Sequence, residues 1–152
     1  MQIGFIGVGN MARAIIDGLV AAKAVTGSDL HLHSGHLEHY QAYAESLGAQ
    51  IEPDNSAVLA NSDVVFLAVK PKMVDAVLTE VHSAFTASPT YLVSMVSGID
   101  LASLRQIAGS TQPMLRIMPN LNVAIGAGMT AYAPNPAAAT SDVTNSVVGL
   151  LA

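Results

Sequence analysis

The chain has 152 residues, of which 51% are hydrophobic and 11% charged; this length suits one domain with a sizeable core, so we expect residues 1–152 to form a single domain. The formal charge of −5 and the six scattered basic residues argue against nucleic acid as a partner, and the absence of cysteine excludes disulfides and thiol catalysis. Apolar runs stay short of the roughly 20 residues of a membrane helix, and the first residues predict a core strand rather than a signal peptide, so we expect no membrane partner and a cytoplasmic location.

Short apolar strands alternate with helical segments along the chain. Strands are predicted at residues 3–6, 30–33, 49–51, 64–69, 91–96 and 114–118, with 128–133 as a seventh strand on an edge. Helices are predicted at residues 11–20, 37–47, 56–61, 73–83, 101–107 and 137–151. Fully apolar strands between helices are typical of a parallel sheet covered on both faces. Because crossovers are right-handed, the sequence predicts an α/β fold with a doubly wound, mostly parallel, Rossmann-like sheet.

The first predicted strand leads into Gly7-Val8-Gly9-Asn10-Met11-Ala12, a G-x-G-x-x-A sequence that is followed by a helix. In this setting Gly7 allows the tight turn, and Gly9 lacks a Cβ that would keep a pyrophosphate away from the backbone. The free N–H groups at the start of the helix then face a dianion. We therefore predict a dinucleotide site that includes Ile6, Gly7, Gly9, Asn10 and Met11. The alternative is a tight strand–helix turn that binds no ligand.

The end of the second predicted strand bears on the choice of cofactor. A carboxylate at this position would bind the ribose 2′-hydroxyl of NAD, but the strand ends in Ser34-Gly35-His36, and Glu38 already belongs to the next predicted helix. A hydroxyl, a glycine and a helix N-terminus suit a 2′-phosphate. We therefore expect NADP(H) rather than NAD(H), with Ser34 and His36 at the site. The alternative is that Ser34 only caps the helix.

A second group of candidate residues follows the fourth predicted strand, because ligands of doubly wound sheets bind beyond the carboxyl ends of the strands. This group is Ala68, Val69, Lys70 and Pro71. Pro71 suits the start of a helix and keeps Lys70 out of the helical region. We expect Lys70 in the crevice, in contact with the ribose or a phosphate of the cofactor; the alternative is a solvated lysine.

The remaining candidates lie at three further strand or helix ends. Asn55 comes just before a short predicted helix, where it either lines the cofactor or serves as the N-cap. Ser97 and Gly98 follow the fifth strand, where a glycine permits close approach of a ligand or only serves the turn. Asn120 follows the sixth strand and points toward the substrate side, whereas we interpret Arg116, within the strand, as structural.

Four histidines, at positions 31, 33, 36 and 39, lie within nine residues, a density that suggests zinc. His31 and His33 share a strand face, and His36 and His39 share a helix face, so no clear ligand geometry follows from two different elements. We therefore expect no metal site and interpret these histidines as surface side chains. The sequence identifies no catalytic residue.

Taken in this order, the motifs resemble the pyrroline-5-carboxylate reductase family. The resemblance rests on residues 5–11 with 14–19, on Val69-Lys70-Pro71, on Val93-Ser94 with Gly98, and on Arg116-Ile117-Met118-Pro119-Asn120. It implies reduction of 1-pyrroline-5-carboxylate to proline with NADPH or NADH. It also implies that residues 7–11 hold the pyrophosphate, that Ser34 and His36 lie near the adenosine ribose or its phosphate, that Asn55 and residues 68–71 line the cofactor, and that residues 96–98 approach the nicotinamide.

Two departures from the family pattern limit the expected activity. The family usually continues the M-P-N motif with Thr-Pro, where this chain has Leu121-Asn122. Family members also continue into an all-helical C-terminal domain that forms the dimer and supplies most substrate contacts, and we expect that domain to be missing here. The chain should then bind NADP(H) but reduce the imine poorly alone. Alternatives are a non-catalytic dinucleotide-binding or regulatory module, a reductase of a related imine or β-hydroxy acid, and, for the apolar segment 143–151, self-association.

Overall fold

The computed structural model describes residues 1–87, 90–109 and 111–151; Ala152, the last residue of the predicted domain, lies outside them. One sheet runs through the molecule in the strand order β3-β2-β1-β4-β5-β6-β7. The strands are β1 (Ile3–Ile6), β2 (Leu30–His33), β3 (Gln50–Ile51), β4 (Val64–Leu67), β5 (Tyr91–Ser94), β6 (Met114–Met118) and β7 (Ala131–Pro134). The first six are parallel and β7 is antiparallel to β6, so the predicted doubly wound, mostly parallel sheet with an edge strand is confirmed.

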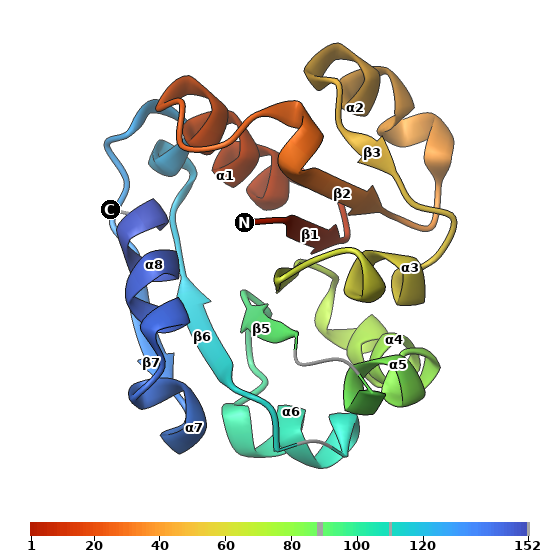
Figure 1. The fold of residues 1–152 in the computed structure, drawn as a ribbon, viewed down its shortest axis with the longest axis vertical. Helices are drawn as coiled ribbons and strands as arrows, with labels where there is room; N and C mark the ends of the chain where they lie inside the picture. The colour runs from red at the N-terminus through yellow and green to blue at the C-terminus, as the bar shows by residue number, and fades with distance from the viewer. Residues whose placement is uncertain (88–89, 110, 152) are drawn as a thin grey trace.

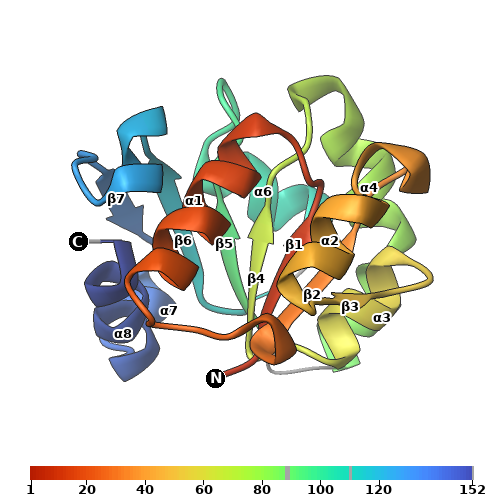
Figure 2. The same ribbon diagram turned by 90° about the horizontal axis from the view of Figure 1, so that it is seen from above.

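Helices cover both faces of this sheet (Figure 1, Figure 2). They are α1 (Asn10–Ala21), α2 (Gln41–Leu47), α3 (Asn55–Ala60), α4 (Val74–Glu80), α5 (His82–Ala87), α6 (Leu101–Ala108), α7 (Pro136–Ala139) and α8 (Asp142–Leu151). Short 3₁₀ turns are η1 (Gly27–Asp29), η2 (Leu37–His39), η3 (Pro71–Met73) and η4 (Leu121–Ile125). Within the described ranges, no helix combines the length and the apolar character that crossing a bilayer requires.

The sheet separates two apolar cores, one on each face. One core packs α1, α2 and α8 against the sheet and contains Phe5 and Phe66, whose stacked rings have centroids 4.8 Å apart. The other packs α3 to α6 against the opposite face and contains Leu67, Leu78 and Phe85. Every residue of β1 and β4 is buried, because strands in the middle of such a sheet meet helices on both sides. This explains why their sequences are continuous apolar runs.

Side-chain caps and glycines set several helix ends. The carboxylate of Asp54 accepts the N–H of Ala57 at 2.8 Å at the start of α3, and the carboxylate of Asp100 accepts the N–H of Ser103 at 2.7 Å at the start of α6. These bonds satisfy donors that the first helical turn leaves free. Helices α2 and α6 end at Gly48 and Gly109, which adopt the left-handed conformation that glycine tolerates best.

Three helices that the sequence predicts as continuous are interrupted. Between η2 and α2, Tyr40 leaves the helical region (φ −134°, ψ −5°) and is 2% exposed. Between α4 and α5, Val81 is likewise buried, so at both breaks packing overrides local helix preference. Between α7 and α8, the hydroxyl of Ser141 accepts the N–H of Val143 at 3.2 Å and starts a new helix.

Strand bounds differ from the prediction by up to three residues. Strands β4 and β5 end at Leu67 and Ser94, two residues earlier than expected, and β7 starts at Ala131 instead of residue 128. Ala68 and Val69 therefore belong to the loop after β4 and are half-buried. This shift moves both residues to the edge of the sheet.

Candidate functional site

The carboxyl ends of the parallel strands lie along one edge of the sheet, at the top of Figure 2. Ile6, Leu67, Ser94 and Arg116 form one row near this edge, since each is the Cα partner of the next. The predicted site residues follow strand ends at this edge: residues 7–11 follow β1, residues 34–36 follow β2, residues 68–71 follow β4, Ser97 and Gly98 follow β5, and Asn120 follows β6. The parallel arrangement therefore brings them to the same edge, as expected for a doubly wound sheet.

Gly7 forms the turn between β1 and α1. Its N–H donates to the carbonyl of His33 at 2.8 Å, which ties the turn to the end of β2. Its φ is +94°, and a Cβ at this position would lie 2.6 Å from the carbonyl oxygen of Ala68. Both the backbone conformation and the lack of space therefore require glycine here.

Gly9 is the N-cap of α1. Unlike Gly7, it is not required by its backbone conformation or by the space around it. Its φ of −86° and ψ of −171° are open to any residue, and a Cβ built there would meet nothing within 4 Å. No side chain caps the start of α1, so its first N–H groups face outward at the positive end of the helix dipole. Neither the backbone nor the packing needs a glycine at this position, whereas an approaching anion would benefit from one.

A cavity of about 400 Å³ lies beside this turn, between the ends of β1 and β2, the loop after β4, the start of α3, the turn η3 and helix α4. Five predicted residues line it: Ile6, Gly7, Ser34, Asn55 and Val69. Gly35, the glycine expected beside a 2′-phosphate, also lines it. The remaining lining residues were not predicted from the sequence: His33, Lys72, Met73, Ala76, Val77 and Glu80. A somewhat larger groove, of about 450 Å³, lies beside the opposite edge of the sheet, and no predicted site residue lines it.

The spacing of four of the unpredicted lining residues could have indicated that they share a helix face. Met73, Ala76, Val77 and Glu80 recur at intervals of three and four residues, which places them on one face of a helix. Glu80 is a charged residue on this otherwise apolar face. A charged residue on an apolar helix face indicates a polar role for Glu80. Nothing in the local sequence around Lys72 indicates that it lines the cavity.

Asn55 and Glu80 form a polar pair at the cavity. The side-chain amide of Asn55 donates to a carboxylate oxygen of Glu80 at 3.1 Å, and Asn55 is 8% exposed. Asn55 is the first residue of α3 and not its N-cap, because Asp54 supplies the capping carboxylate. The N-cap alternative for Asn55 is therefore wrong. Burial of an amide is costly unless it is hydrogen-bonded, and the pair with Glu80 satisfies it.

The loop after β2 brings Ser34 to the cavity but not His36. The turn η2 begins after His36 without a side-chain cap, so the alternative that Ser34 caps a helix is wrong. His36 is exposed and its Nδ1 lies 3.4 Å from Glu38. Burial raises the pKa of the Tyr40 hydroxyl, and a hydrogen bond from the backbone of Ser34 opposes this shift.

The other predicted residues lie along the edge outside the cavity. Gly9, Asn10 and Met11 start α1, Ala68, Lys70 and Pro71 follow β4, Ser97 and Gly98 follow β5, and Asn120 follows β6. Lys70 has the extended backbone that was predicted from Pro71 (φ −65°, ψ 146°), and its side chain is exposed. Asn120 precedes η4, makes no capping bond and is exposed.

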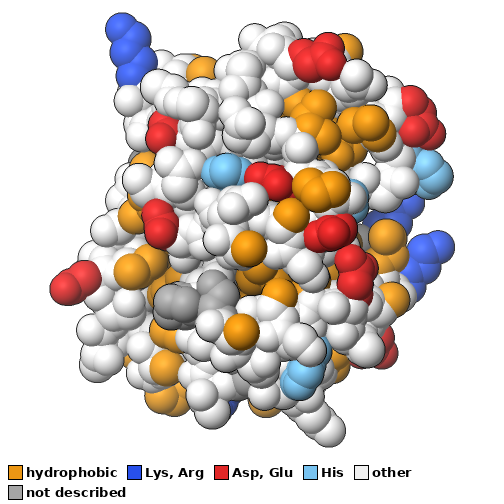
Figure 3. Space-filling view, turned by 45° about the vertical axis from the view of Figure 1, so that its right-hand side comes forward, with side chains coloured by type: hydrophobic (Ala, Val, Ile, Leu, Met, Phe, Trp, Pro, Cys, Tyr) orange, Lys and Arg blue, Asp and Glu red, His pale blue; other side chains and the backbone are white. Residues whose placement is uncertain are grey.

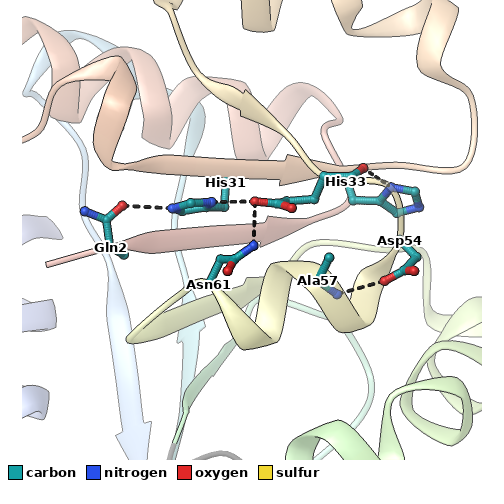
Figure 4. A network of polar contacts seen from close by, with 7 residues as sticks. Gln2, His31, His33, Asp54, Ala57 and Asn61 are labelled. Atoms are coloured by element: carbon teal, nitrogen blue, oxygen red, sulfur yellow. Dashed lines mark hydrogen bonds and ion pairs between the residues drawn. The ribbon is translucent and has the colours of Figure 1, made fainter.

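The histidines of β2 take part in a polar network (Figure 4). His31 Nδ1 lies 2.6 Å from the carboxylate of Glu52, and His31 Nε2 lies 2.8 Å from the side-chain oxygen of Gln2; Asn61 donates to the same carboxylate at 3.0 Å. His33 Nδ1 donates to the carbonyl of Glu52 at 2.9 Å, since a carbonyl only accepts. The interpretation as surface side chains is therefore wrong for His31 and His33. Residues 1–87, 90–109 and 111–151 contain no group of three or more His, Asp or Glu that could hold a metal.

Comparison with known proteins identifies the family of this chain. Residues 2–98 match the family described as NADP oxidoreductase coenzyme F420-dependent. Over 147 residues the chain is 32% identical to the pyrroline-5-carboxylate reductase of Escherichia coli K12, covering 95% of this chain and 54% of that protein. The structure of a pyrroline-5-carboxylate reductase from Coxiella burnetii matches with a TM-score of 0.88 and 26% identity, over 99% of this chain and 55% of that one.

The same fold occurs in the pyrroline carboxylate reductase of Plasmodium falciparum, solved with NADP bound, at a TM-score of 0.83 and 20% identity over 99% of this chain and 53% of that one. The chain thus spans about half the length of these relatives. The resemblance inferred from the motifs is confirmed. The chain belongs to the NADP oxidoreductase coenzyme F420-dependent family, and it corresponds to the N-terminal NAD(P)-binding domain of the pyrroline-5-carboxylate reductases.

Proposed function

We propose that this domain binds NADP(H) along the carboxyl edge of its sheet. The pyrophosphate lies on the start of α1, next to Gly7 and Gly9, and the adenosine half enters the cavity beside β2. No carboxylate stands among the residues after β2 that line this cavity, Ser34 and Gly35, which favours a 2′-phosphate over the 2′-hydroxyl of NAD. The reductase from Plasmodium falciparum, which carries NADP, supports the same choice.

The observation that carries this proposal is the glycine at position 9. Its φ and ψ suit any residue, and its missing Cβ leaves open space over the uncapped start of α1. A side chain there would disturb nothing in the protein but would stand between the helix N–H groups and an anion. The site is thus shaped for a group that lies outside the protein.

We infer further that the domain is the cofactor half of a reductase of 1-pyrroline-5-carboxylate. When bound, NADPH would supply the hydride that, with a proton for the nitrogen, reduces the imine to proline and leaves NADP⁺. Ser97, Gly98 and Asn120 lie at the β5 and β6 end of the edge, where the nicotinamide and the substrate would meet. None of these three side chains titrates near neutral pH, so this part of the domain contributes orientation rather than a proton.

Calorimetric titration with NADPH and, separately, NADH tests the proposed binding; it needs no intrinsic fluorophore, which suits a chain without tryptophan. We expect clear binding of NADPH and weaker binding of NADH. Ser34→Ala should weaken NADPH binding roughly tenfold, because a hydrogen bond to a charged group is lost. Ser83→Ala, an exposed position on α5, serves as the matched control and should change neither affinity. Failure of the parent chain to bind either nucleotide would contradict the proposal.

A further inference from the structure

The charged groups around the cavity are unevenly placed. Among the described residues that line it, Lys72 contributes an ammonium group and Glu80 a carboxylate. Lys72 lies in the turn η3 and Glu80 is the last residue of α4. The Glu80 carboxylate accepts the amide of Asn55. Within the described ranges, Lys72 takes part in neither an ion pair nor a hydrogen bond. Its ammonium is therefore not neutralised by the protein.

Local geometry brings Lys72, and not Lys70, to this cavity. Lys70 is held extended before Pro71, and its carbonyl accepts the N–H of Met73 at 2.9 Å, which closes the turn η3. The turn makes Lys72 and Met73 part of the cavity wall, whereas Lys70 precedes it and does not line the cavity. Figure 3 shows Lys and Arg side chains at the right margin of the displayed face and at its upper left, with carboxylates spread over the face, including its right side.

The wall formed by the end of β2 complements this cation. Ser34 contributes a hydroxyl and Gly35 an exposed backbone, and a Cβ on Gly35 would meet nothing within 4 Å. The pocket thus combines a hydroxyl, open space and an unpaired ammonium, but no carboxylate at the end of β2. This combination suits a phosphate monoester, which carries close to two negative charges and three acceptor oxygens near neutral pH.

We propose that Lys72 is the residue that selects a 2′-phosphorylated nucleotide, by pairing with the 2′-phosphate across the cavity from Ser34. The proposal rests on the NADP(H) binding proposed above and adds a specificity residue to it. NAD(H) has a hydroxyl where NADP(H) has this phosphate, so Lys72 contributes little to its binding. Lys70 contacts parts that both cofactors share and does not discriminate between them.

The test compares Lys72→Gln, Lys70→Gln and Lys72→Arg by calorimetry with NADPH, NADH, adenosine 2′,5′-bisphosphate and adenosine 5′-monophosphate. Lys72→Gln should weaken NADPH and the bisphosphate roughly tenfold while changing NADH and the monophosphate less than about twofold. Lys72→Arg keeps the positive charge and should therefore retain most of the preference for NADPH over NADH. Lys70→Gln should weaken NADPH and NADH binding alike. Lys23→Gln, just beyond the C-terminal end of α1, controls for the loss of one positive charge.

Each outcome bears on one of the two proposals. An unchanged ratio of NADPH to NADH affinity in Lys72→Gln would overturn the role of Lys72 while leaving NADP(H) binding intact. Loss of the preference in Lys70→Gln instead would assign the selection to Lys70. Binding of neither nucleotide by the parent chain would contradict the proposed function, and the role of Lys72 with it. Thermal unfolding of every variant shows whether a loss of affinity reflects a loss of folded protein.

Discussion

At the scale of single residues, Gly7 and Gly9 serve different purposes although they stand in one motif. Gly9→Ala should leave the midpoint of thermal unfolding unchanged, because the new Cβ meets no protein atom within 4 Å. The same change should lower the affinity for NADPH at least about tenfold, since the methyl group stands between the pyrophosphate and the start of α1. Calorimetry and thermal unfolding of one sample separate the two effects.

Two further glycine variants serve as controls. Gly7→Ala should destabilise the fold by roughly 1–3 kcal/mol, because an alanine is strained at φ +94° and its Cβ would meet the carbonyl of Ala68. Gly149→Ala, in α8 and outside the proposed cofactor site, should raise stability by roughly 0.5–1 kcal/mol with no effect on NADPH binding. A Gly9→Ala variant that binds NADPH as tightly as the parent would contradict the proposal that the pyrophosphate binds at this turn.

At the scale of elements, the N-cap of α6 makes a pH-dependent contribution to stability. The N–H of Ser103 holds the pKa of the Asp100 carboxyl below its ordinary value of 3.8. A carboxyl whose pKa is lowered by folding stabilises the native state above its unfolded pKa, and this contribution is lost as the pH falls through the folded pKa. Asp100→Ala should therefore lower the urea midpoint at neutral pH, with a difference from the parent that shrinks below about pH 4.

Asp100→Asn separates charge from hydrogen bonding in this experiment. Asparagine is as good an N-cap as aspartate, so this variant should keep most of the neutral-pH stability. Its difference from the parent should not follow the titration of a carboxyl. A constant gap between the parent and Asp100→Ala down to pH 2 would show that the capping bond does not depend on the charge.

The order of the elements could be predicted because the strands are continuous apolar runs, whereas the helix breaks could not. Around Tyr40 and Val81 the local sequence continues to favour a helix, and both residues are buried where the helices break, so the breaks depend on tertiary packing that no local pattern shows. Part of the candidate site could also be predicted from the order of the strands. Gly7 and Ser34 follow strands whose carboxyl ends must meet, but the pairing of Asn55 with Glu80 joins two helices whose relative position no local pattern fixes.

At the scale of the whole molecule, one end of the candidate site stays open. The cavity proposed for the adenosine half is walled by the ends of β1 and β2, the start of α3, η3 and α4. At the other end of the edge, near β6, large apolar side chains are exposed: Leu121 is 57% exposed, Ile125 78% and Met129 80%. Exposed apolar side chains that lie this close together usually meet another surface. The chain spans about half the length of these relatives, and we propose that in a full-length reductase these side chains contact the other half of the protein.

Because the end of the candidate site near β6 is open, we expect the chain to bind its cofactor but to be a poor catalyst. The 152-residue chain should bind NADPH yet reduce 1-pyrroline-5-carboxylate at least about a thousandfold more slowly than a full-length reductase, because a large share of enzymatic rate comes from holding both reactants in place. The measurement is the oxidation of NADPH, followed by absorbance with and without the imine, beside the Escherichia coli enzyme as the positive control. Gly9→Ala should abolish any residual imine-dependent rate, which would tie that rate to the site at the start of α1. Turnover by the isolated chain at the rate of the full-length enzyme would mean that the open end near β6 is already a complete substrate site.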